Sequence, residues 1–232
     1  MTSNFAVDST GFSTIRVANW RASDHGKYTL RKAADYPKPD WRKLHAMIGL
    51  FSKAISAVIV TNRKGQGSGD SANLRRLAEA TLDSDFTING IAADGAYFTG
   101  SIMTYIEHEL DATAFIPRHS NTTGSKMKTF GRARTVEYCE DWAKPNGRRR
   151  LMYRFRTLIE AVFSSLKRRF GDFVLKRDEV SRKIDVLCKA ICYNLCLIVY
   201  FEELFDVRLD LTEDPAFKRL RKANDAPRRK AA

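Results

Sequence analysis

The order of apolar patterns along the chain constrains its fold more than any other feature. Strand-like segments come first, and later strands then alternate with helical patterns. Strands are expected at residues 4–8, 11–20, 41–61, 87–97 and 112–117, with a turn near Ser52 and Lys53 dividing the third segment. Helices are expected at residues 72–82, 98–110, 132–143, 153–170 and 177–204. This order predicts a mixed α/β domain that has antiparallel strands at its start and parallel strands added afterwards.

The composition allows a packed core and indicates a polyanionic partner. Hydrophobic residues make up 44% of the 232 residues, which excludes a globally disordered chain. The formal net charge is +13. Such a positive balance favours nucleic acid as the partner, with a membrane surface as the weaker alternative.

One apolar segment near the C-terminus carries three of the four cysteines. Cys188, Cys192 and Cys196 repeat every four residues, so they share a helical stripe that could touch a soft metal. No fourth ligand stands at zinc-like spacing, so packing in the core is favoured. The run from Ala190 to Phe201 is shorter than a bilayer requires and predicts a buried helix. We therefore expect no membrane span and a reducing cytoplasm.

The Gly-rich stretch at residues 63–71 is not a phosphate-binding loop of the GxxxxGK[ST] type, because the Lys and Ser or Thr are not in that order. Asp70 or Ser71 is instead expected to cap the helix that follows.

Two aspartates occupy positions where strands are expected to end. Asp8 closes the first expected strand, and Asp94 closes the strand that begins at residue 87. Each one precedes residues typical of a turn, which is the alternative interpretation of either residue alone. Strand ends in α/β sheets are also where ligand-binding groups gather, so the pair is a candidate site.

The helix expected at residues 153–170 is strongly basic but contains one acid. At about 100° per residue, Tyr153, Arg156, Glu160 and Lys167 fall within an arc of about 60°. An ion pair between Arg156 and Glu160 on a solvated face would account for this pattern. A carboxylate among phosphate-binding cations is also what a metal-dependent reaction on DNA requires, because hard divalent ions prefer oxygen ligands.

The same residues carry a resemblance to a known family. The spacing Tyr153-x2-Arg156-x3-Glu160-x6-Lys167 matches the signature of DDE transposases of bacterial and archaeal insertion sequences of the family numbered four. The segments FAVDSTGF and IAADGAYF are similar to those around the first and second catalytic Asp of that family. The resemblance covers nearly all of residues 4–203.

The resemblance implies an RNase H-like α/β fold, a mixed sheet flanked by helices with extra C-terminal helices. It implies that Asp8, Asp94 and Glu160 are catalytic and hold two Mg²⁺ or Mn²⁺ ions. It also implies that Tyr153, Arg156 and Lys167 contact DNA, the element ends and target, with two copies of the chain as a homodimer.

The domain organisation implied is a catalytic domain at residues 1–206 followed by a mobile basic tail at residues 207–232. Because Asp8 lies near the start of the sequence, the DNA-binding region that the family carries ahead of its first Asp is expected to be absent. A catalytically inactive DNA-binding remnant and a metal-dependent nuclease on the same fold remain alternatives to a transposase.

Overall fold

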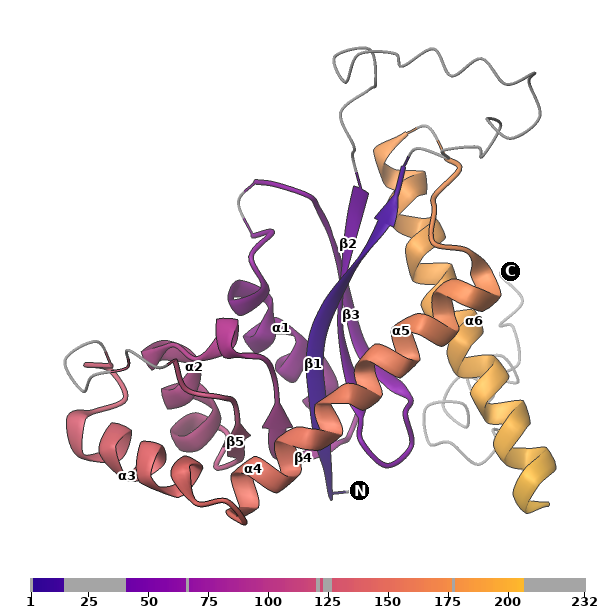
Figure 1. Cartoon of the computed structure of the whole chain (residues 1–232). Helices are drawn as coiled ribbons and strands as arrows, with labels where there is room; N and C mark the ends of the chain where they lie inside the picture. Colours follow the sequence, from indigo (N-terminus) through magenta and orange to yellow (C-terminus); the bar gives the residue numbers. More distant parts are fainter. Residues whose placement is uncertain are drawn as a thin grey trace, which may run out of the picture. The chain divides into compact units, whose positions relative to one another are not determined.

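The structure is a computed structural model, and it describes residues 2–14, 41–65, 67–119, 122, 127–176 and 178–206 (Figure 1). The chain divides into two compact units, Met1–Cys192 and Tyr193–Ala232. The first unit contains the sheet and its covering helices. The basic tail expected at residues 207–232 lies outside the described residues.

A mixed sheet of five strands forms the centre of the first unit. Its strands are β1 (Thr2–Ser13), β2 (Trp41–Gly49), β3 (Ile55–Asn62), β4 (Thr87–Ala92) and β5 (Thr113–Phe115). They lie in the order β3-β2-β1-β4-β5. The β1–β2 and β2–β3 pairs are antiparallel, whereas the β1–β4 and β4–β5 pairs are parallel. The predicted antiparallel start with parallel additions is therefore confirmed.

The helices also follow the predicted order. They are α1 (Asp70–Leu82), the 3-10 turn η3 (Gly95–Tyr97), α2 (Gly100–Thr104), the π-helical segment η4 (Tyr105–Glu109), α3 (Arg132–Ala143), α4 (Arg148–Tyr153), the 3-10 turn η5 (Arg154–Arg156), α5 (Thr157–Phe170) and α6 (Glu179–Phe205). The segments α4, η5 and α5 follow one another directly, so the basic helix begins earlier than expected and contains a tighter turn.

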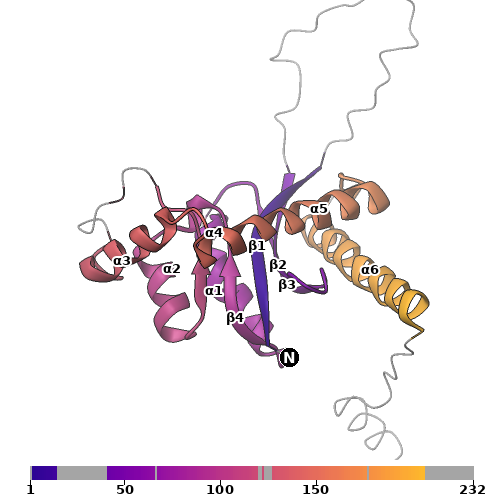
Figure 2. The same ribbon diagram turned by 60° about the horizontal axis from the view of Figure 1, so that its bottom comes forward.

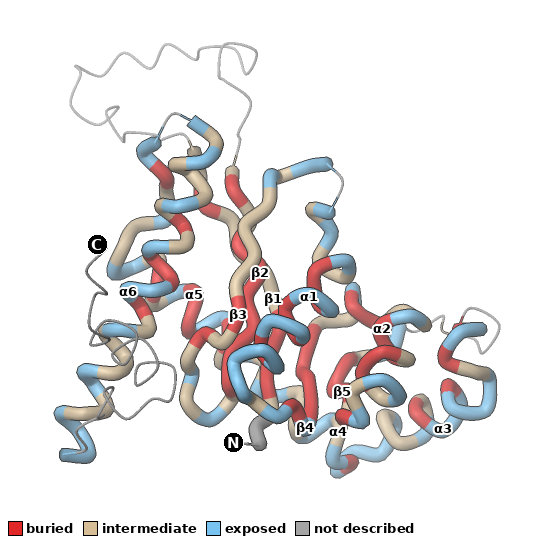
Figure 3. Tube along the Cα trace, turned by 180° about the vertical axis from the view of Figure 1, so that it is seen from behind, coloured by how far each residue is buried: buried red, intermediate tan, exposed pale blue. Residues whose placement is uncertain are grey.

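Each face of the sheet has its own core, because successive side chains of a strand point to opposite faces. Phe5 and Val7 of β1 belong to a cluster that also contains Leu74 and Leu77 of α1. The alternate residues Ala6, Asp8 and Phe12 lie on the other face, where α5 packs against β1. Figure 2 shows α4 and α5 on one side of the strands and α1 on the other, and Figure 3 shows the buried stretches of the strands between them.

The prediction that Asp8 ends a short strand is wrong. β1 continues through Asp8 to Ser13, because β2 pairs with it as far as Ser13↔Trp41. The two strands approach closely at Gly11, where a Cβ would lie 3.1 Å from Cδ1 of Trp41. Residues 15–20 of the second expected strand lie outside the described residues.

The expected side-chain cap of α1 is also wrong. Gly69 occupies the N-cap position and makes no side-chain capping bond, while Asp70 is the first residue of the helix. The Asp70 carboxylate is directed instead to Lys43 and His45 of β2. A charged partner on the neighbouring strand binds a carboxylate more strongly than a backbone N–H does.

Two expectations about α6 need correction. By length and composition alone this helix could cross a membrane, with a mean hydropathy of 1.8 over its most apolar window, and only 22% of that window is buried. Length and composition are weak evidence of a span, but the prediction of a buried helix is wrong. Cys188 and Cys192 are exposed and Cys196 is partly exposed, so they are not core residues. The helix has more apolar residues around its circumference than one packed face requires.

Candidate active site

Strand register places Asp8 and Asp94 side by side. The parallel pairing of β1 with β4 ends at Ala6↔Ala92, and each aspartate follows two residues later. Asp8 remains in β1, paired opposite Ala46 of β2, whereas Asp94 lies just beyond β4. Both side chains are partly exposed. The predicted meeting of the two acids at one end of the parallel pair is therefore what the topology produces.

The two aspartates also interact electrostatically. Burial raises the pKa of Asp8, and the charges of Asp94 and Asp70 raise it further, while the Ser9 N–H and Arg156 act in the opposite direction. The Ser9 N–H donates to Asp8 Oδ1 over 2.8 Å. Asp94 caps η3 through a 2.8 Å hydrogen bond that its Oδ1 accepts from the N–H of Ala96. One oxygen of each acid is thus held by backbone of its own segment.

Arg156 joins Asp8 to Glu160. Its Nη1 donates to Asp8 Oδ2 over 2.8 Å, and its Nη2 donates to Glu160 Oε1 over 2.5 Å. The side chains of Arg156 and Asp8 are 18% and 20% exposed, whereas that of Glu160 is 54% exposed. We call these three residues the acid bridge. The ion pair expected from the spacing forms, and it extends across to the first acid on β1.

The other two residues of the predicted arc lie on either side of the acid bridge. Cζ of Arg156 lies 5.9 Å from the centre of the Tyr153 ring. Nζ of Lys167 lies 5.6 Å from the centre of the Phe12 ring, on the same face of β1 as Asp8 but four residues further along. Burial lowers the pKa of Lys167. The predicted arc is therefore a row of groups that follows β1 rather than a single cluster.

Next to Tyr153, an open cavity of about 530 Å³ combines cations with aromatic rings. Arg118, Arg150 and Arg154 supply the charge, and Trp142 and Tyr153 supply the rings. The two rings meet edge to face, with their centres 5.5 Å apart. Guanidinium groups and aromatic faces are the groups that bind phosphates and bases of a nucleic acid strand.

A comparison of the sequence with models of protein families identifies the family to which the chain belongs. The family model described as Transposase DDE domain matches residues 2–195.

The chain belongs to the DDE transposase family. Its mixed sheet with flanking helices is the RNase H-like fold of such transposases, as the sequence predicted. The family acts on DNA in transposition and generally uses divalent metal ions. No curated protein matches the chain.

The acids of this transposase domain fit a hard cation in kind but are not gathered around one point. Among the described residues, no three His, Cys, Asp or Glu side chains lie close enough together to hold a metal ion. The Arg156 guanidinium nevertheless stands between Asp8 and Glu160, so the two carboxylates already share one cation. Asp8, Asp94 and Glu160 carry carboxylate oxygens, the type of atom that Mg²⁺ or Mn²⁺ prefers as a ligand.

Sequence reasoning missed Asp70 as a neighbour of the acids. Its Oδ1 lies 2.8 Å from Lys43 Nζ and 3.3 Å from Nδ1 of the fully buried His45. Its charge raises the pKa of Asp8 and, after burial, that of Tyr97. The alternation of Lys43 and His45 on one face of a strand is the signal that pointed to a buried polar partner.

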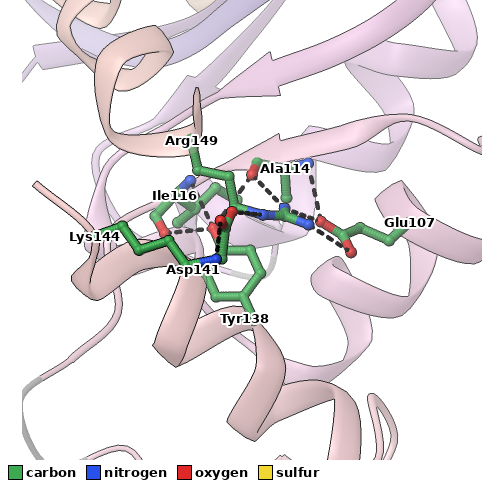
Figure 4. Close-up of polar contacts among 7 residues, drawn as sticks. All are labelled: Glu107, Ala114, Ile116, Tyr138, Asp141, Lys144 and Arg149. Atoms are coloured by element: carbon green, nitrogen blue, oxygen red, sulfur yellow. Dashed lines mark hydrogen bonds and ion pairs between the residues drawn. The ribbon is translucent and has the colours of Figure 1, made fainter. Parts of the chain in front are cut away.

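Sequence reasoning also missed a second arginine of the same helical run, seven residues before Arg156. Figure 4 shows Arg149 ion-paired with Glu107 of η4 and bonded through Nε to Asp141 Oδ2 of α3 over 3.1 Å. Its Nη1 donates to the carbonyl of Ala114 in β5 over 2.9 Å, and its Cζ lies 4.5 Å from the centre of the Tyr138 ring. These five residues, the Arg149 cluster, attach α4 to the edge of the sheet.

Proposed function

We propose that this chain is the catalytic domain of an insertion-sequence transposase of the family numbered four. In this proposal Asp8, Asp94 and Glu160 hold two Mg²⁺ or Mn²⁺ ions, cut DNA at the element ends and transfer the cut strand. The observation that carries it is the acid bridge, in which two acids far apart in sequence share one cation beside the third.

The chemistry follows from what the carboxylates can do. When bound, a pair of divalent ions activates the attacking oxygen and stabilises the leaving oxygen of a phosphodiester. Asp8 lies in β1 and Asp94 lies just beyond β4, two residues after the last pair of the β1–β4 register, and Glu160 lies on a helix packed against β1. The more exposed Glu160 has the greatest freedom to move toward the aspartates. Water cuts the strand, and the freed 3′-hydroxyl attacks the target.

The DNA path follows the basic face of the helical run. Tyr153, Arg156 and Lys167 are the proposed backbone contacts, and the cavity beside Tyr153 extends this surface with Arg118, Arg150 and Arg154. Contacts of this type position the duplex without reading its sequence. The net charge of +13 supports a polyanionic substrate.

The remaining parts of the proposal concern organisation. Residues 1–206 form the catalytic domain, and the basic segment at residues 207–232 follows it outside the described residues. The chain works in the cytoplasm of a bacterium or archaeon, at the nucleoid, and two copies hold two ends together.

A cleavage and joining assay tests this function. The chain is incubated with a labelled duplex carrying the ends of its element and with Mg²⁺ or Mn²⁺, beside Glu160→Ala and Asp94→Ala. Nicking that needs metal and is lost in both variants, together with joined products, is the expected result. Cutting without joining would identify a nuclease, and salt-sensitive binding without any cutting would identify an inactive remnant.

A further inference from the structure

The Arg156 side chain occupies the place that a cation between Asp8 and Glu160 would take. Its two terminal nitrogens each bond a different carboxylate, at 2.8 Å and 2.5 Å. A divalent ion bound by both acids would lie about 2 Å from its carboxylate ligands and would compete with the guanidinium for the space between them. The guanidinium and such an ion cannot share this space.

The Arg156 guanidinium is also held differently from that of an arginine that only supports the fold. Burial opposes the charge of Arg156, and its pKa is raised mainly by Asp8, followed by Tyr153 and Glu160. Arg149, in contrast, also donates to the backbone carbonyl of Ala114, and its Cζ lies 4.5 Å from the centre of the Tyr138 ring, closer than the 5.9 Å between Arg156 and the Tyr153 ring. The contacts of Arg156 are therefore chiefly with the acids, and a competing cation can replace it.

A displaced guanidinium needs another anion, and a DNA phosphate offers the same two-pronged geometry as a carboxylate. We propose that Arg156 exchanges between the acid bridge and a DNA phosphate, so that DNA and divalent metal bind this chain cooperatively. Without DNA, Arg156 neutralises the acids and weakens metal binding. With DNA bound, it moves to the phosphate and leaves Asp8 and Glu160 to the metal.

This inference rests on the proposed function, because it assumes that Asp8 and Glu160 are metal ligands. Coupling between two ligands is reciprocal, so each must raise the affinity of the other by the same factor. Removing Arg156 must then change the metal affinity in the direction opposite to that caused by removing a metal ligand. Metal binding in the absence of DNA must become tighter.

The test measures Mn²⁺ binding to the chain without DNA, by titration calorimetry or by the electron paramagnetic resonance of free Mn²⁺. The variant is Arg156→Gln, and the matched control is Arg168→Gln, which removes the same charge from an exposed position of α5. We expect Arg156→Gln to bind Mn²⁺ roughly fivefold or more tightly than the unmodified chain. Arg168→Gln should change the affinity by less than about twofold, since solvent screens a distant charge.

A second variant separates geometry from charge and covers the case in which Arg156→Gln does not fold. Arg156→Lys keeps the charge, but one ammonium does not reproduce the two-pronged contact. Its Mn²⁺ affinity should lie between those of the unmodified chain and Arg156→Gln. Adding a short duplex should tighten Mn²⁺ binding to the unmodified chain and leave that of Arg156→Gln unchanged, after subtraction of Mn²⁺ bound by DNA alone.

The outcomes distinguish failure of this inference from failure of the proposed function on which it rests. Equal or weaker Mn²⁺ binding by Arg156→Gln would overturn the exchange of Arg156. If Glu160→Ala and Asp94→Ala also bound Mn²⁺ as well as the unmodified chain, the proposed metal site itself would fail. Loss of binding in those two variants without tightening in Arg156→Gln would reject the exchange alone.

Discussion

Two arginines of one helical run, seven residues apart, each bridge a pair of carboxylates. Arg149 joins Glu107 to Asp141, and Arg156 joins Asp8 to Glu160. Their side chains are almost equally exposed, at 19% and 18%. The ion pairs alone therefore do not distinguish a structural arginine from one in a reaction site.

The difference lies in what else surrounds each guanidinium. Arg149 also binds the carbonyl of Ala114 and covers the Tyr138 ring, so three different elements fix its position. Arg156 contacts acids that lie beside a third carboxylate, Asp94, and one of them, Glu160, is 54% exposed. An arginine that also bonds the backbone holds helices in place, whereas one held chiefly by carboxylates can be exchanged.

The largest expected effect is on the Arg149 cluster. Arg149→Ala leaves Glu107 partly buried without its cationic partner and removes one of the two donors to the Ala114 carbonyl, so we expect a loss of about 2–4 kcal/mol in the free energy of unfolding. Urea denaturation measures it. Arg148→Ala, at an exposed neighbouring position, should cost less than about 0.5 kcal/mol. Equal effects of the two substitutions would show that the Arg149 cluster does not stabilise the fold.

Tyr138→Phe should have the next largest effect. The Tyr138 hydroxyl accepts the N–H of Ile116 over 3.1 Å and donates to its carbonyl over 2.7 Å, in a fully buried position. Losing it leaves a backbone group unsatisfied and should lower the free energy of unfolding by about 1–2 kcal/mol. Tyr153→Phe, for which no such backbone bond is expected to be lost, serves as the control in the same denaturation measurement.

Asp70→Asn tests the acid beside the site through pH. Burial alone raises the pKa of Asp70, but hydrogen bonds from His45 and Lys43 outweigh it and lower the pKa well below its usual 3.8. A carboxyl group whose pKa is lower in the folded than in the unfolded chain stabilises the fold at pH values above its unfolded pKa. This contribution of Asp70 is lost as the pH falls below about 4. We expect Asp70→Asn to cost about 1 kcal/mol at pH 7. The difference from the unmodified chain should shrink between pH 4 and pH 2, and a constant difference would contradict the ion pair.

Arg156→Gln should have the smallest effect on stability. Its partner Glu160 is largely solvated, and its other partner, Asp8, is 20% exposed and keeps the hydrogen bond from the Ser9 N–H. We therefore expect a change below about 1 kcal/mol in urea denaturation. A loss as large as that of Arg149→Ala would mean that the acid bridge is a structural element, and the contrast between the two arginines would fail.

The fold was largely predictable because its strands and helices have clear apolar periods. The sequence could not show that β1 continues through Asp8, since Ser9, Thr10 and Gly11 are typical of a turn. Pairing with β2 and the approach of Trp41 to Gly11 override that local preference.

The site was predictable in part for a similar reason. Asp8 lies in β1, Asp94 lies just beyond β4 and Glu160 stands at helical spacing from Arg156, so local pattern could single them out as candidates. Arg149 lies in a run of three arginines, and its partners Glu107 and Asp141 come from elements far along the chain. No local pattern distinguishes it from Arg148 and Arg150. The sequence did not predict the exposed face of α6, because apolar composition does not show which side of a helix packs against the rest of the protein.

A change of metal preference tests the central claim most directly, because it reports on contact between a side chain and the ion. Asp94→Cys replaces a hard oxygen ligand with a softer sulfur, which binds Mn²⁺ better than Mg²⁺. Nicking of a labelled duplex carrying the element ends is measured with each metal, beside Asp94→Ala. The account predicts that Asp94→Cys is inactive with Mg²⁺ and regains activity with Mn²⁺, while Asp94→Ala is inactive with both. Full activity of Asp94→Ala, or equal activity of Asp94→Cys with the two metals, would contradict it.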